Sequence, residues 1–338
     1  MSRTLVVLWI AVVCVIAGCA PKSPEVVVYC ALDREFSEPI LDKFEQRTGI
    51  RVRVKYDTES TKSVALAAQI LEEMPRPRCD LFWNNEILHT IRLARAGALQ
   101  PYVSPMGASY PAEYRSSENL WYGFAARARI MLVNRAMVTK DETPTRLVEL
   151  TEHRWFDKAA MAKPLFGTTA TYVASLYVVL GQAKTESLMR ALRVNGVEVL
   201  SGNKQVAVDV GAGVRAFGLT DTDDALAEIR ENRPVDVIFL DQGSDDTGIL
   251  LIPNTLALIK GGEHPEEAKQ LLEYLLSPEV ESALAEGPSG QYPLNPSTKA
   301  QPPLPLPEGA KRMAVDFEAA ASEWERVGRF VKEEFTVQ

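Results

Sequence analysis

The alternation of short apolar runs with amphipathic stretches in the first third of the chain constrains its fold more than any other feature. Apolar runs at 26–29 and 81–83 and an alternating segment at 50–56 are separated by helical patterns at 37–47 and 60–71. Short apolar or alternating runs indicate strands, and apolar residues at every third or fourth position indicate helices. Strand–helix–strand–helix–strand in this order predicts right-handed βαβ units and a parallel sheet. We therefore expect an α/β protein.

The second half continues the alternation without repeating the sequence. No period of about 20–50 residues is visible, which argues against a solenoid, and a length of 338 residues favours two domains. The expected strands lie at 130–133, 197–200, 235–240, 249–252 and 255–259, and the expected helices at 172–180, 204–211, 225–231, from Pro265, after Ser277 and at 311–335.

The first 24 residues have the pattern of an export signal. A basic start with Arg3 precedes the apolar run 5–16 and then Ile16-Ala17-Gly18-Cys19, which resembles a bacterial lipobox. We expect residues 1–18 to be removed, Cys19 to be lipidated and residues 19–24 to form a linker. The protein would then be tethered to a membrane, in the periplasm or at the cell surface. An ordinary cleaved signal or a short membrane anchor is the alternative.

Composition and motifs exclude several classes of function. The net charge of −8 is the wrong sign for a protein that binds nucleic acid through its phosphates. The P-loop, the GxSxG motif and the HExxH motif are absent, and the three histidines lack the spacing of zinc ligands. We therefore expect neither an enzyme nor a nucleic-acid-binding protein.

Several segments, in order along the chain, carry a family resemblance. They are Val27-Val28-Tyr29 with Asp33-Arg34-Glu35, Phe44 to Ile50, Asp80 to Glu86, Ala96 to Leu99, Ala126 to Arg129, Glu266 to Pro278 and Tyr292-Pro293-Leu294. Together they resemble the type II periplasmic solute-binding proteins of ABC importers, in particular the ferric-iron-binding branch.

The resemblance implies an architecture and a set of partners. It implies a two-lobed type II periplasmic-binding-protein fold, in which each lobe is a mostly parallel sheet flanked by helices. Hinge strands join the lobes, and the ligand lies in a central cleft. Lobe 1 is expected at 25–126 plus 253–305, and lobe 2 at 127–252 plus 306–338. The expected partners are a small ligand and the permease and ATPase subunits of an importer. The protein is expected to be a monomer without a prosthetic group.

The resemblance also implies a metal site with altered ligands. The tyrosine pair of iron-binding members falls on Asp223-Asp224, the ligand of their first loop on Asp33, and their glutamate on Asn85 or Glu86. Tyr172 matches a further tyrosine of some members, and Asp221 adds a third carboxylate to the pair. Ferric ion prefers anionic oxygen, but carboxylates serve Ca²⁺, Mg²⁺, Mn²⁺ or an organic cation equally well.

Each acid also has a purely structural interpretation. Asp221 could be the N-cap of a helix whose first turn contains Asp223 and Asp224, where carboxylates complement the helix dipole. Asp33 could be a turn residue, and Glu86 an acid in the first turn of a helix.

A second group of residues indicates an anion site. Gly167-Thr168-Thr169-Ala170-Thr171 precedes an apolar helix, and the free N–H groups of a helix N-terminus hold anions. In the iron-binding relatives the matching turn binds a synergistic anion beside the metal, and the matching asparagine falls on Asn203. Arg127 and Arg129 alternate on a predicted crossing strand, so one of them should face the cleft. Helix capping and ordinary salt bridges are the alternatives.

The sequence therefore predicts an extracytoplasmic solute-binding lipoprotein of an ABC importer. Ferric iron or another hard cation, with a synergistic anion, is the first choice of ligand. A small phosphorylated or carboxylated organic anion is the second, and a ligand sensor or structural lipoprotein is the alternative from another class.

Overall fold

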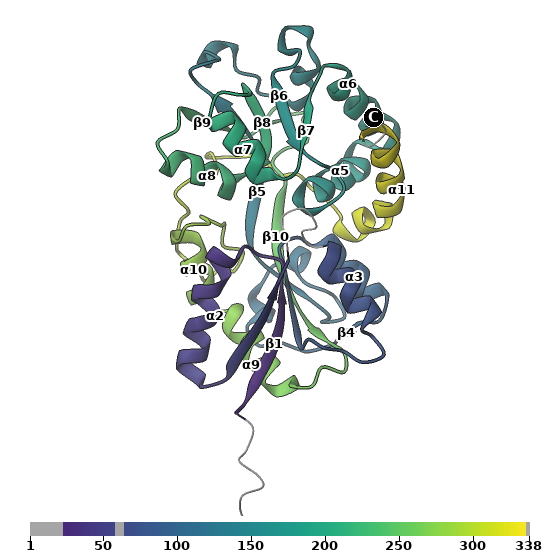
Figure 1. Cartoon of the computed structure of the whole chain (residues 1–338), viewed down its shortest axis with the longest axis vertical. Helices are drawn as coiled ribbons and strands as arrows, with labels where there is room; N and C mark the ends of the chain where they lie inside the picture. Colours follow the sequence, from purple (N-terminus) through teal and green to yellow (C-terminus); the bar gives the residue numbers. More distant parts are fainter. Residues whose placement is uncertain (1–22, 58–63, 336–338) are drawn as a thin grey trace, which may run out of the picture.

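The computed structural model describes residues 23–57 and 64–335 (Figure 1). The predicted signal at 1–18, the predicted lipidation site Cys19 and linker residues 20–22 lie outside these ranges. Within the described ranges, no helix is both long and apolar enough to cross a membrane. Two α/β lobes are stacked along the long axis of the molecule (Figure 1).

The lower lobe of Figure 1 contains the parallel βαβ units that the first third of the sequence predicts. Its central strand β1 (Glu25–Cys30) pairs in parallel with β2 (Arg51–Tyr56) on one side and β3 (Leu81–Asn84) on the other. Helices α2 (Arg34–Thr48) and α3 (Val64–Glu72) connect these strands. The α2 helix begins earlier than predicted: Asp33 is its N-cap, and Ser37 lies inside it, where its hydroxyl donates to the Asp33 carbonyl at 3.0 Å.

Two long buried strands join the lobes. Strand β5 (Tyr122–Asn134) pairs with β10 (Leu251–Ile259) through its first half and with β8 (Phe217–Asp221) and β9 (Val235–Ile238) through its second half. The two strands predicted at 249–252 and 255–259 are therefore one strand, with a register shift between Pro253 and Asn254. Every residue of β5 is buried, so its arginines need charged or polar partners inside the protein.

The upper lobe has a second sheet. Strand β6 (Ala159–Ala162) runs parallel to β7 (Glu198–Leu200) and to β8. The helices of this lobe are α5 (Gly167–Leu180), α6 (Gln182–Val194), α7 (Asn203–Gly211) and α8 (Thr222–Arg230) (Figure 1). The order across the whole sheet path is β2-β1-β3-β10-β5-β8-β6-β7, and β5 is the strand that both halves share.

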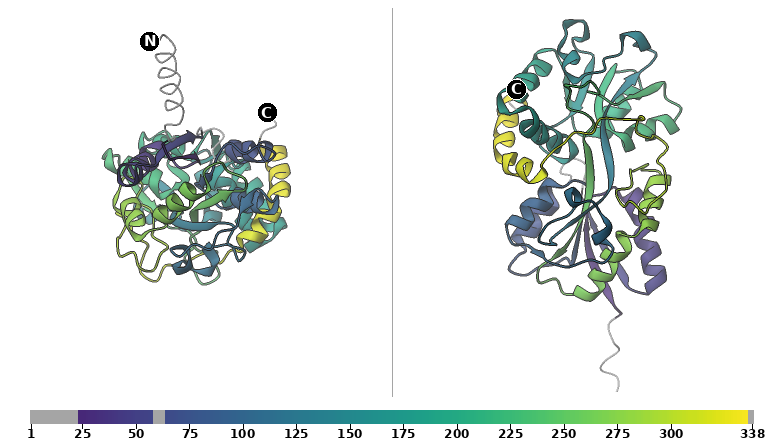
Figure 2. Two further views of the ribbon diagram at one scale, coloured as in Figure 1. Left: turned by 90° about the horizontal axis from the view of Figure 1, so that it is seen from below. Right: turned by 180° about the vertical axis from the view of Figure 1, so that it is seen from behind.

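The remaining elements complete both lobes and tie them together. Figure 2 shows α11 (Phe317–Phe335) along one side of the molecule, where it packs on α5 and α6 of the upper lobe and on α4 (Leu88–Arg95) of the lower one. The segment predicted at 306–338 for lobe 2 thus contacts both lobes. The other elements are β4 (Leu99–Gln100), α9 (Pro265–Leu275), α10 (Pro278–Glu286) and short 3₁₀ helices at Gly107–Ser109, Ala112–Tyr114, Lys140–Glu142, Leu147–Thr151 and His153–Trp155.

Candidate functional site

A cavity of about 30 Å³ lies where strands of both lobes end. Asp33 follows β1 and Asn85 follows β3 in the lower lobe, while Asp221 is the last residue of β8 in the upper lobe. Ligands of open α/β sheets bind beyond the carboxyl ends of the strands, so the topology explains why these residues meet. The predicted site residues that line the cavity are Asp33, Asn85, Arg127, Thr168, Thr169, Asn203, Asp221, Asp223 and Asp224.

Three carboxylates are grouped at the junction of β8 and α8. Asp221 ends the strand and is the N-cap of the helix, and Asp223 and Asp224 lie in the first turn of the helix. One ligand oxygen from each lies within 4.8 Å of the other two, so the group could hold a metal ion. The helix begins at Thr222, earlier than the predicted residue 225, and this early start brings both acids to the cavity. Their place in a first turn also fits the structural interpretation.

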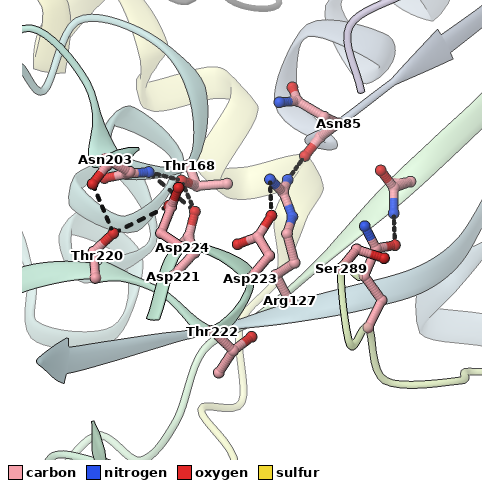
Figure 3. A network of polar contacts seen from close by, with 12 residues as sticks. Asn85, Arg127, Thr168, Asn203, Thr220, Asp221, Thr222, Asp223, Asp224 and Ser289 are labelled. Carbon is pink, nitrogen blue, oxygen red and sulfur yellow. Dashed lines mark hydrogen bonds and ion pairs between the residues drawn. The ribbon is translucent and has the colours of Figure 1, made fainter. Parts of the chain in front are cut away.

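Arg127 on β5 lies between the two lobes (Figure 3). Its guanidinium donates to the backbone carbonyl of Asn85 in the lower lobe and lies 3.6 Å from the Asp223 carboxylate in the upper lobe. Burial alone would lower the pKa of Arg127, but the charges of the surrounding carboxylates outweigh burial and raise it. They act in the order Asp223, Asp221, Asp33 and Asp224. Arg127 is therefore a fixed internal cation of the acid cluster.

Arg129 lies two residues farther along β5 and does not line the cavity. Its guanidinium forms a 2.9 Å ion pair with Asp221, and both side chains are almost fully buried. The Thr168 hydroxyl and the Asn203 amide also donate to the Asp221 carboxylate (Figure 3). Groups that were predicted to hold a free anion thus hold a carboxylate of the chain itself.

The Glu86 side chain turns away from the cavity. Its carboxylate accepts hydrogen bonds from the backbone N–H groups of Leu88 and His89, at 2.6 and 2.9 Å, which are donors at the start of α4. The Asn84 amide donates at 2.8 Å, and the Thr171 hydroxyl on α5 of the other lobe donates at 3.0 Å. The structure therefore gives Glu86 the role of a helix-terminus acceptor that also links the lobes.

Three other predicted residues also lie outside the cavity lining. Thr171 is directed to Glu86, and Ala170 borders a separate apolar groove beside α11. The Arg129 guanidinium lies over the Tyr172 ring, with the guanidinium carbon 5.6 Å from the centre of the ring. Tyr172 borders a small separate cavity. Burial and the nearby Asp241 raise the pKa of Tyr172, although Arg129 opposes them, so the phenol stays protonated.

Part of the cavity wall was not predicted from the sequence. The missed lining residues are Ala162, Lys163, Phe166, Ser201 and Gly202. They end or follow β6 and β7, so the rule that places Asp33 and Asn85 after their strands could have found them. Lys163 matters most, because it adds a second positive charge to the wall.

The wall as a whole is acidic. It contains the carboxylates of Asp33, Asp221, Asp223 and Asp224 and the positive charges of Arg127 and Lys163. Carboxylate oxygens are the ligands that hard cations prefer. The arrangement can therefore bind a small cation, and Arg127 offsets part of the repulsion among the acids.

Comparisons with known proteins agree with this architecture. The major ferric iron-binding protein of Neisseria meningitidis serogroup A is 22% identical over 300 residues, which cover 83% of this chain and 84% of that protein. The iron-bound HitA structure from Pseudomonas aeruginosa superposes with a TM-score of 0.83 at 24% identity, covering 91% of this chain and 99% of that one. The AfuA structure from Actinobacillus pleuropneumoniae with fructose-6-phosphate bound superposes with a TM-score of 0.81 at 20% identity, covering 93% and 99%.

At these identities, the two structures show a shared two-lobed fold. The family profile described as "Bacterial extracellular solute-binding protein" matches residues 89–323, which is more than half of the chain. The chain therefore belongs to the bacterial extracellular solute-binding proteins.

Proposed function

We propose that this protein captures a hard cation in the cavity between its lobes and delivers it to an ABC importer, with ferric iron as the first choice of ligand. One observation carries the proposal: the ligand oxygens of Asp221, Asp223 and Asp224 lie within 4.8 Å of one another, at a cavity that Asp33 lines from the opposite lobe. Four carboxylates at one small cavity repel one another unless positive charge lies among them. Arg127, Lys163 and Arg129, which is paired with Asp221, supply three positive charges, and a bound cation would supply the rest.

The size of the cavity is compatible with a small ion. A cavity needs about 10–15 Å³ to hold one water molecule, so about 30 Å³ is enough for an ion of that size. An ion that has lost most of its hydration shell fits this space. The curated relative from Neisseria meningitidis, a ferric iron-binding protein, supports the same choice of ligand.

The proposal includes the cellular setting that the sequence predicts. Lobe 1 at 25–126 plus 253–305 and lobe 2 at 127–252 plus 306–338 would close over the ligand. The predicted boundaries lie side by side, because Ala126 pairs with Pro253 and Arg127 with Ile252. Lipidation at Cys19 would tether a monomer near the permease and ATPase subunits of an importer.

A phosphorylated or carboxylated organic anion is the second candidate, favoured by the positive charges of Arg127 and Lys163 in the wall. The structure of a relative with bound fructose-6-phosphate supports this class. However, Arg127 already contacts Asp223 and Asn85, which leaves fewer donors for an external anion.

Calorimetric titration of the purified protein tests the proposal. We expect saturable binding of ferric ion, added as its nitrilotriacetate complex, and of terbium(III), added as the chloride. Inorganic phosphate and fructose-6-phosphate should produce no binding heat. Elemental analysis of protein purified from its own host should find the bound metal. Saturable binding of either anion, together with no response to both cations, would overturn the cation assignment in favour of the second candidate.

A further inference from the structure

Asp221 occupies the N-cap position of α8 without capping that helix. An aspartate at this position normally accepts a hydrogen bond from an N–H group of the first turn of its own helix. The Asp221 side chain makes no such bond. Its carboxylate is 1% exposed and is directed instead across the upper lobe toward α5 and α7 (Figure 3).

Three donors from three different elements converge on this carboxylate. The Arg129 guanidinium on β5 donates at 2.9 Å, the Thr168 hydroxyl on α5 at 2.5 Å and the Asn203 amide on α7 at 3.0 Å. We call these three residues the Asp221 cradle. A guanidinium, a hydroxyl and an amide beside the first turn of a helix form the kind of donor set that binds free carboxylate or phosphate.

Neighbouring hydrogen bonds hold the cradle in place before any ligand arrives. Arg129 also donates to the Leu219 carbonyl at 3.2 Å and to the Asn203 side-chain oxygen at 3.2 Å. The Thr169 hydroxyl donates to the same Asn203 oxygen at 3.0 Å. Donors fixed by so many contacts need little reorganisation to bind an anion, so the cradle suits a carboxylate whether or not that carboxylate belongs to the chain.

The carboxylate of Asp221 can serve the cradle and a cation together. An ionised carboxylate has about four lone-pair directions, and the cradle uses three of them. One of its oxygens lies within 4.8 Å of ligand oxygens of Asp223 and Asp224. The cradle leaves one lone-pair direction of Asp221 Oδ1 unused, and an ion that those two residues also bind would take that direction.

We infer that Asp221 is a built-in anion, which fills the anion-binding cradle of this solute-binding protein so that cation capture needs no free anion from the medium. The part of this inference that concerns cation capture rests on the function proposed above. The part that concerns the cradle stands on the hydrogen bonds alone. It also explains why Arg129, Thr168 and Asn203, which the sequence suggested for an external anion, are already engaged.

Removing the carboxylate and supplying a free one tests the cradle. Asp221→Ala leaves a space that formate can fill, with its carboxylate among the same donors. We expect formate to raise the melting temperature of Asp221→Ala saturably, relative to chloride at the same ionic strength, and to leave the wild type unchanged. The double variant Asp221→Ala with Arg129→Gln should lose this response. Asp241→Ala is the matched control, because it also removes a buried carboxylate but one that lies outside the cradle. The donors to the Asp241 carboxylate are the Leu147 backbone amide and the Thr247 hydroxyl.

Titration with terbium(III) chloride tests the link to cation capture. In chloride, Asp221→Ala should bind terbium about tenfold to hundredfold more weakly than the wild type, because it lacks one charge-assisted contact. Formate should restore most of that loss, and it should change the affinity of the wild type less than twofold. Should Asp221→Ala fail to fold, Asp221→Ser replaces it, since a serine N-cap supports α8 and still leaves room for formate.

The outcomes separate the two proposals. If a folded Asp221→Ala or Asp221→Ser variant shows no response to formate, the cradle is refuted. If wild-type affinity for terbium rises steeply with added formate, the built-in role of Asp221 is refuted. If formate stabilises the variant but neither the wild type nor any variant binds terbium, the cradle stands and the proposed cation function fails.

Discussion

The neighbouring acids Asp223 and Asp224 should respond differently to the same substitution, because Arg127 interacts with them unequally. Of the four carboxylates that act on Arg127, Asp223 has the largest effect and Asp224 the smallest. At 3.6 Å, the attraction between Arg127 and Asp223 is about 5 kcal/mol for an effective dielectric constant of about 20. Removing one partner of a buried ion pair typically costs about 3–5 kcal/mol.

The expected loss of stability follows from these values. Asp221, Asp33 and Asp224 still act on Arg127 when the Asp223 charge is removed. We therefore expect Asp223→Asn to lower the free energy of unfolding of the ligand-free protein by about 2–3 kcal/mol, somewhat less than a full buried-pair loss. Asp224→Asn should change it by less than about 1 kcal/mol, because relief of repulsion offsets the lost interaction with the helix dipole. Urea denaturation of both variants measures the difference.

Cation affinity should fall in both variants. Each substitution removes an anionic contact worth about 1.5–3 kcal/mol, which corresponds to about a tenfold to hundredfold weaker binding. Calorimetric titration with terbium(III) chloride measures this loss. Unchanged affinity in both variants would leave Asp223 and Asp224 as first-turn helix acids and refute the cation site. Equal losses of stability in the two variants would refute the role of Arg127 as the internal counterion of Asp223.

Three further predictions concern other parts of the molecule. An iron-loaded form should lack the visible absorption band of a tyrosine-to-iron charge transfer, because no tyrosine is among the described residues that line the cavity. A strong visible band that disappears in Tyr172→Phe would contradict this prediction. Thr171→Val removes the 3.0 Å hydrogen bond to Glu86 between the lobes, so terbium affinity should fall about tenfold or less and small-angle scattering should show a more open ligand-free protein. An unchanged radius of gyration and an unchanged affinity would count against a role for this hydrogen bond in holding the lobes together. Burial lowers the pKa of His89 to about 4. As the pH falls, His89 is therefore protonated in the unfolded chain before it is protonated in the folded protein, and the free energy of unfolding should decrease between about pH 6.5 and 4, by about 3 kcal/mol at most. Urea denaturation of His89→Phe should show a shallower decrease, and an equal slope in the two proteins would exclude His89 as the source of the pH dependence.

The alternation of strands and helices was enough to predict the fold class, whereas the family resemblance was needed to place Asp33 and Asn85 at the cavity. In a parallel sheet the carboxyl ends of neighbouring strands meet at one edge, which explains why these two residues lie close together. The predicted site residues that do not line the cavity include direct neighbours of residues that do. Asn85 and Glu86 are adjacent, yet only Asn85 lines the cavity, because the Glu86 carboxylate accepts from the first N–H groups of α4. That preference depends on where the helix begins, and periodicity locates a helix terminus only approximately.

The register of β5 could not be obtained from the sequence for a similar reason. Arg127 and Arg129 are two positions apart, so alternation places their side chains on the same face of β5, and it does not tell which of them reaches the cavity. The pairing of Arg129 with Asp221 across β5 and β8 decides it, and these residues are 92 positions apart in the chain. Long-range pairing of this kind comes from tertiary packing of the whole lobe and has no local signal.

The ion pairs of the two arginines also change which charge of ligand these residues favour. In the sequence alone, Arg127 and Arg129 indicate an anion as readily as Asp221, Asp223 and Asp224 indicate a cation. In the fold, each arginine lies against one of these acids, Arg129 against Asp221 and Arg127 against Asp223. A buried ion pair has little net charge, so the two pairs nearly cancel in the field at the cavity. Asp33 and Asp224 then add two negative charges to the wall against the positive charge of Lys163. The charge that a ligand meets is therefore negative, which favours a cation.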